Sequence, residues 1–227
     1  MEKQEKIRCV WEHRGGDTLL WLADYPGSFA RGASLEEAMA KIPGELRDWS
    51  EWTGQPVPET AEPVVIRDLP CSLDVRDADS DALLEEERPP LSREEYVRLR
   101  EMALRSAENF LRLYESVPNP DQSGNPVRRT FYGAVPRTAR EMYEHTKNVN
   151  AYYFGEIGAE ADNEGDIVRC RRRGFEMLEK QPDFLENSLV EGSWGEDWTL
   201  RKVLRRFIWH DRIHARAMVR MRKRTFE

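Results

Sequence analysis

Apolar and polar residues alternate with the period of a β-strand in the N-terminal part of the chain. Ile7, Cys9 and Trp11 alternate with charged residues in KIRCVWEH, RGGD is a strong turn sequence, and TLLWLADYPG predicts a second strand. SFARGAS predicts at most a short third strand, and PVVIRDL predicts a further strand after an intervening helix. These patterns indicate a small sheet.

The pattern changes to a helical period after the third predicted strand. Ser34 is a candidate N-cap, and Glu37 three residues later completes a capping-box sequence. LEEAMAKIPGELRDWSEW then continues with apolar residues spaced for one helix face. Pro43 lies inside this run and predicts that the helix is kinked or divided. The apolar face consists of Leu35, Ala38, Ile42, Leu46 and Trp49.

The order hairpin, strand, helix, strand over about residues 5–68 resembles the small antitoxin-like domain of the HicB family. In that family a strand leads through a YPG turn to a helix that starts G-x-S/T-x-E-E-A. A turn followed by a capped amphipathic helix also suits other small α+β modules. The resemblance implies that residues 1–68 form a small α+β domain. The matching residues are Tyr25, Pro26, Gly27, Gly32, Ser34, Glu36, Glu37 and Ala38.

Residues 69–90, LPCSLDVRDADSDALLEEERPP, are acidic and contain few large apolar side chains. Two prolines close the segment. This composition is typical of a linker, because such a segment buries too little apolar surface to offset the entropy lost on ordering. We therefore expect a domain boundary near Pro90.

Beyond the boundary, apolar positions recur with a helical period to the end of the chain. Four amphipathic helices joined by polar connections predict an all-α four-helix bundle over residues 91–227. Together with the N-terminal module, this gives an α+β fold class for the whole chain. The first three helices are predicted to begin near Ser92, Pro136 and Asp166, and the fourth at Thr199 or Asp197.

Charge and composition narrow the classes of function. The chain has 227 residues and a formal net charge of −7, which opposes binding to phosphate backbones or anionic membranes. The basic C-terminal segment more simply forms a solvated helix side than a nucleic-acid site. No apolar run is long enough to span a membrane. Cys9, Cys71 and Cys170 form no CxxC pair, which indicates a reducing compartment. We expect a cytoplasmic protein with no nucleic-acid or membrane partner.

The histidines carry the clearest chemical signal. The chain has four, and His210 and His214 lie four residues apart in RRFIWHDRIHARAM, which places both imidazoles on one helix face. His145, in another predicted bundle helix, is the candidate third ligand of one metal ion. Three histidines leave a coordination position open, as in catalytic zinc centres. An H-x-x-x-H pair also arises by chance, and His145 alone fits a hydrogen-bonded core residue equally well.

The segment WTLRKVLRRFIWHDRIHARAM, preceded by EGSWGED, resembles the final helix of the DinB-like superfamily. Members of that superfamily carry a W-T-x-R-x-x-L opening and then H-x-x-x-H. Their remaining histidine lies in the second helix of a four-helix bundle, where REMYEHTKNVNAYYF matches it. The resemblance covers about residues 91–224. It implies that His145, His210 and His214 bind a divalent metal ion, with zinc or nickel the usual choice.

Two further residues are candidate catalytic groups. Glu141 precedes His145 by one helical turn, so its carboxylate is a candidate fourth ligand, hydrogen-bond acceptor for an imidazole, or proton acceptor. A solvated helical glutamate is the equally weighted alternative. Tyr152 lies two turns after His145 and is a candidate O–H donor to a substrate anion, although packing in the core explains a tyrosine there more simply.

The DinB-like resemblance implies a metal-dependent enzyme that acts on a small molecule. The best understood members use the ion to lower the pKa of a low-molecular-weight thiol, whose thiolate attacks the substrate. A hydrolase, in which the ion activates water, needs the same open position. The alternative is a non-catalytic stress-response or partner-binding protein in which the ion only stabilises the bundle. A homodimer is also expected, since bundles often pair through apolar helix faces.

Overall fold

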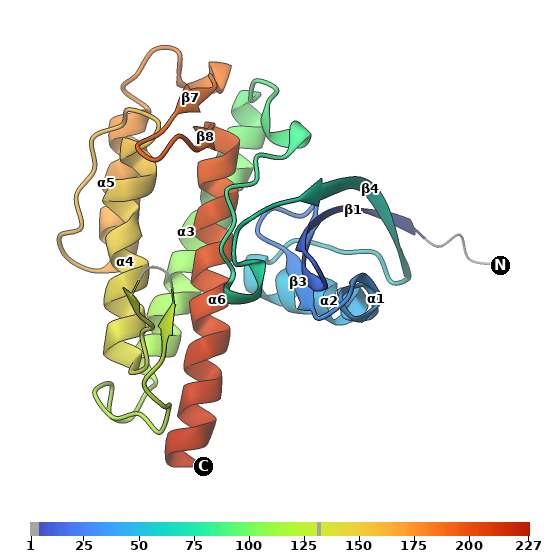
Figure 1. Cartoon of the computed structure of the whole chain (residues 1–227). Helices are drawn as coiled ribbons and strands as arrows, with labels where there is room; N and C mark the ends of the chain where they lie inside the picture. The colour runs from blue at the N-terminus through green and yellow to red at the C-terminus, as the bar shows by residue number, and fades with distance from the viewer. Residues whose placement is uncertain (1–4, 131–132) are drawn as a thin grey trace. The chain divides into compact units, whose positions relative to one another are not determined.

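The computed structural model describes residues 5–130 and 133–227. The chain forms two compact units, one ending at Pro89 and the other running from Pro90 to Glu227. The first contains a four-stranded sheet, and the second consists mostly of helices (Figure 1). The predicted α+β class is therefore confirmed.

The first unit is organised around a sheet with the strand order β3-β2-β1-β4. Its strands are β1 (Glu5–Arg14), β2 (Asp17–Leu22), β3 (Phe29–Gly32) and β4 (Ala61–Pro70). β1 and β2 form an antiparallel hairpin, and β3 pairs antiparallel with β2. Gly15, in the hairpin turn, has a φ of 60°, which glycine adopts without steric cost. β4 pairs parallel with β1, which requires the long connection that contains the helices.

Two helices lie between β3 and β4. α1 (Leu35–Ala40) and α2 (Ile42–Thr53) are separated at Lys41, because Pro43 occupies the first turn of α2. The Ser34 hydroxyl accepts a hydrogen bond from the Glu37 N–H, as the capping sequence predicts. The helices bury their apolar face against the sheet. The core cluster comprises Ile7, Cys9, Leu20, Leu22, Ala30, Ala38, Ile42 and Leu46.

Residues 69–89, predicted to be a linker, belong to the first unit in the structure. The segment contains two 3₁₀ turns, η1 (Val75–Asp77) and η2 (Glu85–Glu87), and it buries Val75 and Leu84. The Ser80 hydroxyl donates a hydrogen bond of 2.7 Å to the buried Glu12 carboxylate of β1. A low apolar content misleads here because polar contacts also attach the segment to the sheet, among them the ion pairs of Arg14 with Asp74 at 2.5 Å and of Arg8 with Glu86 at 3.1 Å.

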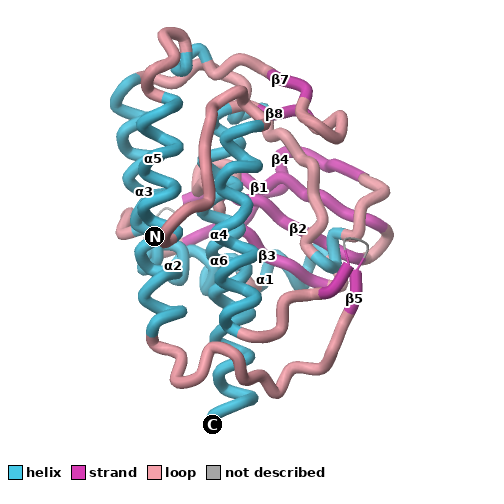
Figure 2. Tube along the Cα trace, turned by 90° about the vertical axis from the view of Figure 1, so that its left-hand side faces the viewer, coloured by secondary structure: helices cyan, strands magenta, loops and turns pink. Residues whose placement is uncertain are grey.

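The second unit contains four long helices, α3 (Arg93–Glu115), α4 (Ala139–Gly155), α5 (Ile167–Leu178) and α6 (Leu200–Phe226). α6 packs against α3 and α4, and α5 packs against the same two helices, as the side-by-side helices in Figures 1 and 2 show. Between the helices lie short strand pairs and one 3₁₀ turn. They are β5 (Arg129–Thr130), β6 (Gly133–Ala134), η3 (Phe184–Glu186), β7 (Val190–Glu191) and β8 (Asp197–Trp198).

The helix starts follow the capping sequences closely. The side chains of Ser92, Asp166 and Thr199 accept backbone hydrogen bonds as N-caps of α3, α5 and α6. α4 begins later than predicted, because Thr138 rather than Pro136 precedes the helix and caps it. Each cap fixes where the helix starts, and so fixes which residues face the neighbouring helices.

A buried ion pair joins three of these helices. Arg171 on α5 and Asp211 on α6 have fully buried side chains, and the two guanidinium nitrogens lie 2.6 and 3.0 Å from the carboxylate oxygens. Arg171 also donates to the carbonyl oxygen of Ala103 on α3 at 3.1 Å, and its guanidinium stacks 4.2 Å from the centroid of the Phe207 ring. The bidentate geometry sets the rotation of α6 relative to α5.

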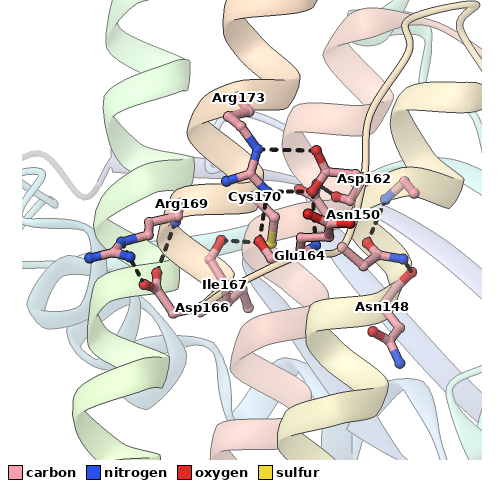
Figure 3. A network of polar contacts seen from close by, with 11 residues as sticks. Asn148, Asn150, Asp162, Glu164, Asp166, Ile167, Arg169, Cys170 and Arg173 are labelled. Carbon is pink, nitrogen blue, oxygen red and sulfur yellow. Dashed lines mark hydrogen bonds and ion pairs between the residues drawn. The ribbon is translucent and has the colours of Figure 1, made fainter.

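The connection between α4 and α5 is attached to both helices (Figure 3). The Asn163 side chain donates to the carbonyl oxygen of Asn148 at 3.1 Å and accepts from the Ala151 N–H at 3.0 Å. Arg173 on α5 pairs with Asp162, which Figure 3 also shows. These bonds hold the middle of α4, three residues beyond His145.

Among the residues that the structure describes, no helix has both the length and the apolar character needed to cross a membrane.

We predict that Arg171→Met destabilises the second unit by about 3–5 kcal/mol, because it leaves the Asp211 carboxylate buried without its cation. Arg173→Met is the matched control, since its pair with Asp162 is about half exposed in each partner, at 40% and 48%, and should contribute about 0–1 kcal/mol. Urea unfolding of both variants measures the difference. Adding Asp211→Asn to Arg171→Met should recover part of the loss. Equal effects of the two arginine substitutions would contradict the role given to the buried pair.

Candidate metal centre

Three imidazoles meet between α4 and α6. His210 and His214 are one turn apart on α6, and His145 faces them from α4. The ring centroids are 5.0 Å apart for His145 and His210, 4.7 Å for His145 and His214, and 4.6 Å for His210 and His214. One nitrogen from each ring lies within 4.8 Å of the other two. The structure therefore brings the three candidate ligands together.

The three rings differ in exposure. His145 is exposed, His214 is half-buried, and His210 is buried, with 9% of its surface exposed. Nδ1 of His210 is buried and accepts or donates no hydrogen bond within the described part of the chain. An unsatisfied buried polar atom is costly, and such an atom in a native site requires an explanation. Metal coordination would supply the missing partner.

The surroundings keep the imidazoles neutral. Burial lowers the pKa of His214 to about 3, and the nearby His145 lowers it further in the same direction. Burial also places the pKa of His210 well below its ordinary value, with smaller contributions from the other two rings and from Arg206. The pKa of His145 is lowered by desolvation as well. A neutral imidazole has a free lone pair, which is the form that binds a metal ion.

The residues fit a divalent transition metal. In a tetrahedral zinc site with Zn–N bonds of about 2.0–2.1 Å, two nitrogens lie roughly 3.3 Å apart. The three imidazole nitrogens lie within 4.8 Å of one another, so side-chain rotations would have to close only the remaining difference. The group contains imidazoles only, among the residues that the structure describes. Imidazole nitrogen suits zinc, nickel and copper rather than magnesium or calcium.

Glu141 is not part of this group. Its carboxylate accepts hydrogen bonds from the backbone N–H groups of Arg137 at 2.8 Å and Thr138 at 3.1 Å. Glu141 is thus the acidic member of the capping box at the start of α4. The one-turn spacing from His145 pointed to the metal site, but the orphan N–H groups at the helix start compete for the same carboxylate.

Tyr152 lies at the edge of the site rather than against the imidazoles. It is 37% exposed, and its ring packs against Trp198 with a centroid distance of 6.0 Å. The buried Tyr153 is the tyrosine that contacts His210, with ring centroids 6.1 Å apart. Burial raises the pKa of Tyr153 to about 12, so its phenol stays protonated. Tyr152 and Tyr153 both follow His145 by about two helical turns. The sequence alone does not show which of the two tyrosines faces α6.

We predict that the metal-free protein loses stability as the pH falls below about 6.5, the ordinary pKa of histidine. Between that pH and about 3, the folded pKa of His214, the unfolded chain binds protons that the folded chain does not. The free energy of unfolding should therefore decrease steadily over this range and be insensitive to these groups above it. Urea unfolding in the presence of a chelator measures the trend, and His214→Gln should reduce its slope. An unchanged slope in His214→Gln would show that this imidazole is not the cause.

Comparison with known proteins adds no assignment. No protein-family model matches the chain, and no curated protein or solved structure matches it either. The candidate site therefore rests on its residues and their geometry.

Proposed function

We propose that the second unit is a metal-dependent enzyme in which His145, His210 and His214 hold one divalent ion, zinc or nickel. The observation that carries this proposal is the buried Nδ1 of His210, which has no hydrogen-bond partner in the described chain and lies in a group of three neutral imidazoles. A core histidine kept for packing alone would normally have this nitrogen satisfied.

We further propose that α3, α4, α5 and α6 form a four-helix bundle of the DinB-like type. The helix contacts support it, because α5 and α6 each pack against both α3 and α4. The sequence W-T-x-R-x-x-L followed by H-x-x-x-H supports it as well. For the first unit, the YPG turn and the capped α1 support a HicB-like assignment.

The proposed activity is a thiol-dependent transfer or a hydrolysis on a small molecule. A bound divalent ion would act as a Lewis acid and lower the pKa of a coordinated thiol or water. The imidazoles contribute three neutral donors, and the exposed His145 marks the side from which a small molecule reaches the site. His210 and Tyr153 are both buried, with ring centroids 6.1 Å apart, so this part of the site is shielded from solvent.

One observation favours a different role, in which the ion is structural. The ligands come from two helices, so an ion would cross-link α4 to α6 even without any reaction. A structural zinc site has no open position, because four protein ligands complete it. The described residues offer three ligands in this group, which favours a site with an exchangeable position.

We predict that purified protein binds about one zinc or nickel ion per chain, as expected for a three-histidine centre. His145→Ala should reduce bound metal severalfold, because two ligands on one helix seldom hold an ion by themselves. His13→Ala, in the first unit, is the matched control and should retain it. Metal content measured by mass spectrometry decides the matter, with circular dichroism to verify folding. Equal metal content in the two variants would end the site assignment.

We also predict that the site has a position open to an added ligand. Cobalt(II) is a spectroscopic substitute for zinc, and a coordinated thiolate adds a charge-transfer band to its absorption spectrum. Adding free cysteine to the cobalt-loaded protein should produce this band, and His145→Ala should abolish it. A cobalt spectrum that does not respond to cysteine, or to any other small thiol, would favour the structural role.

A further inference from the structure

Lys202, Arg206, His210 and His214 follow one another at four-residue steps along α6. Residues at this spacing share one face of a helix. The side chains of Lys202 and Arg206 are buried, although both carry charge. The face that presents the two imidazoles therefore continues as a buried cationic segment, away from the candidate metal centre.

A carboxylate from outside the helices occupies this cationic segment. Glu196 lies 2.9 Å from the Lys202 ammonium and also contacts the Arg206 guanidinium. Burial by itself raises the pKa of Glu196, but Arg206 and Lys202 outweigh it and lower the pKa overall. The Glu196 carboxylate is therefore ionised. Its contacts with an ammonium and a guanidinium group are those that a substrate carboxylate would make in the same place.

The element that carries Glu196 is a small hairpin. β7 and β8 have two residues each, and residues 192–196 form the turn between them. Besides Glu196, the turn is attached through Ser193, whose N–H and hydroxyl donate to the Glu156 carboxylate at 2.7 and 2.6 Å. Gly192 allows this close approach, because a Cβ atom there would lie 1.8 Å from a Glu156 oxygen. β8 is held in place, because Trp198 is buried and the Asp197 carbonyl oxygen accepts a hydrogen bond from the Lys202 ammonium at 2.5 Å. Displacement of Glu196 therefore requires movement of the turn and not of β8.

Aromatic rings connect this carboxylate site to the imidazoles. The Trp198 ring lies 4.9 Å from the Lys202 ammonium and 5.4 Å from the Arg206 guanidinium. Tyr153 packs against Trp198 at 5.5 Å and against His210 at 6.1 Å, measured between ring centroids. Arg206 precedes His210 by one turn, a rise of about 6 Å along the helix. A molecule a few bonds long can span that distance.

We propose that Arg206 and Lys202 form a carboxylate-binding subsite beside the three histidines, which Glu196 occupies until a small organic acid displaces it. This inference rests on the proposed function, since it names the substrate class of that site. Exchange of one carboxylate for another leaves the charge of the buried segment unchanged, so neither cation is left without a counter-charge during binding. The substrate carboxylate would bind the Arg206 guanidinium. The rest of the molecule would extend past Tyr153 towards the imidazoles.

The test uses succinate as the probe and isothermal titration calorimetry on the metal-loaded full chain. Glu196→Gln removes the internal competitor and should tighten succinate binding at least tenfold. Glu191→Gln is the matched control on the same hairpin, because Glu191 is exposed, and it should leave the affinity as in the wild type. Arg206→Lys keeps the charge but loses the planar fork, and should weaken binding at least tenfold. Succinamide, which is uncharged, should not bind to any variant.

The outcomes separate the two proposals. A wild-type protein that binds no metal would contradict the proposed function, whereas the succinate affinities of the metal-free variants would still test the subsite. A protein that binds metal but shows the same succinate affinity in Glu196→Gln, Glu191→Gln and wild type would overturn the subsite alone. Should Arg206→Lys fail to fold by circular dichroism, the Glu196→Gln and Glu191→Gln pair decides the question without it.

Discussion

The buried pair of Arg171 and Asp211 is the interaction on which the candidate site depends. Asp211 directly follows His210, and consecutive residues of a helix point about 100° apart. Because the Asp211 carboxylate is bound by Arg171 from α5, the His210 imidazole is directed away from α5 and towards α4. The pair adds little net stability relative to apolar packing, since both charges lose their hydration. The pair instead fixes the rotation of α6 about its axis, because another rotation would leave a buried charge without its partner.

α4, which carries the proposed ligand His145, is fixed by a separate set of interactions. Thr138 and Glu141 define where the helix starts, and Asn163 binds the backbone at Asn148 and Ala151. His145 lies between these two attachments. A metal site that is assembled from two helices needs both helices held before the ion arrives, since ordering them on binding would reduce the affinity. Polar side chains on both sides of His145 supply this order before any ion binds.

Local sequence signals predict much of the fold, but they predict only part of the candidate site. Caps such as Ser34, Ser92 and Thr199 are short-range interactions, so they predict where helices start, and the i, i+4 spacing predicts that His210 and His214 share a face. Failures occur where a side chain has two possible partners or where the partner is distant in sequence. Glu141 is taken by its own helix start. Segment 69–89 joins the sheet partly through polar contacts, such as those of Asp74 and Ser80, that average composition does not reveal. The contacts of Glu196 with Lys202 and Arg206 depend on the turn between β7 and β8.

Electrostatics explain why Glu196 would be both necessary and replaceable. His210 has Arg206 one turn away and Arg171 nearby, and these cations contribute to lowering its pKa after burial and the neighbouring imidazoles. A divalent ion would add further positive charge to this region, which is tolerable only if anionic groups lie close by. Asp211 is one such group, but it is held in the buried pair and is not free to leave. Glu196 lies in the turn of a short hairpin, so in the proposed mechanism it would stabilise the metal-loaded site at rest and would give up its position when a substrate brings an equivalent carboxylate.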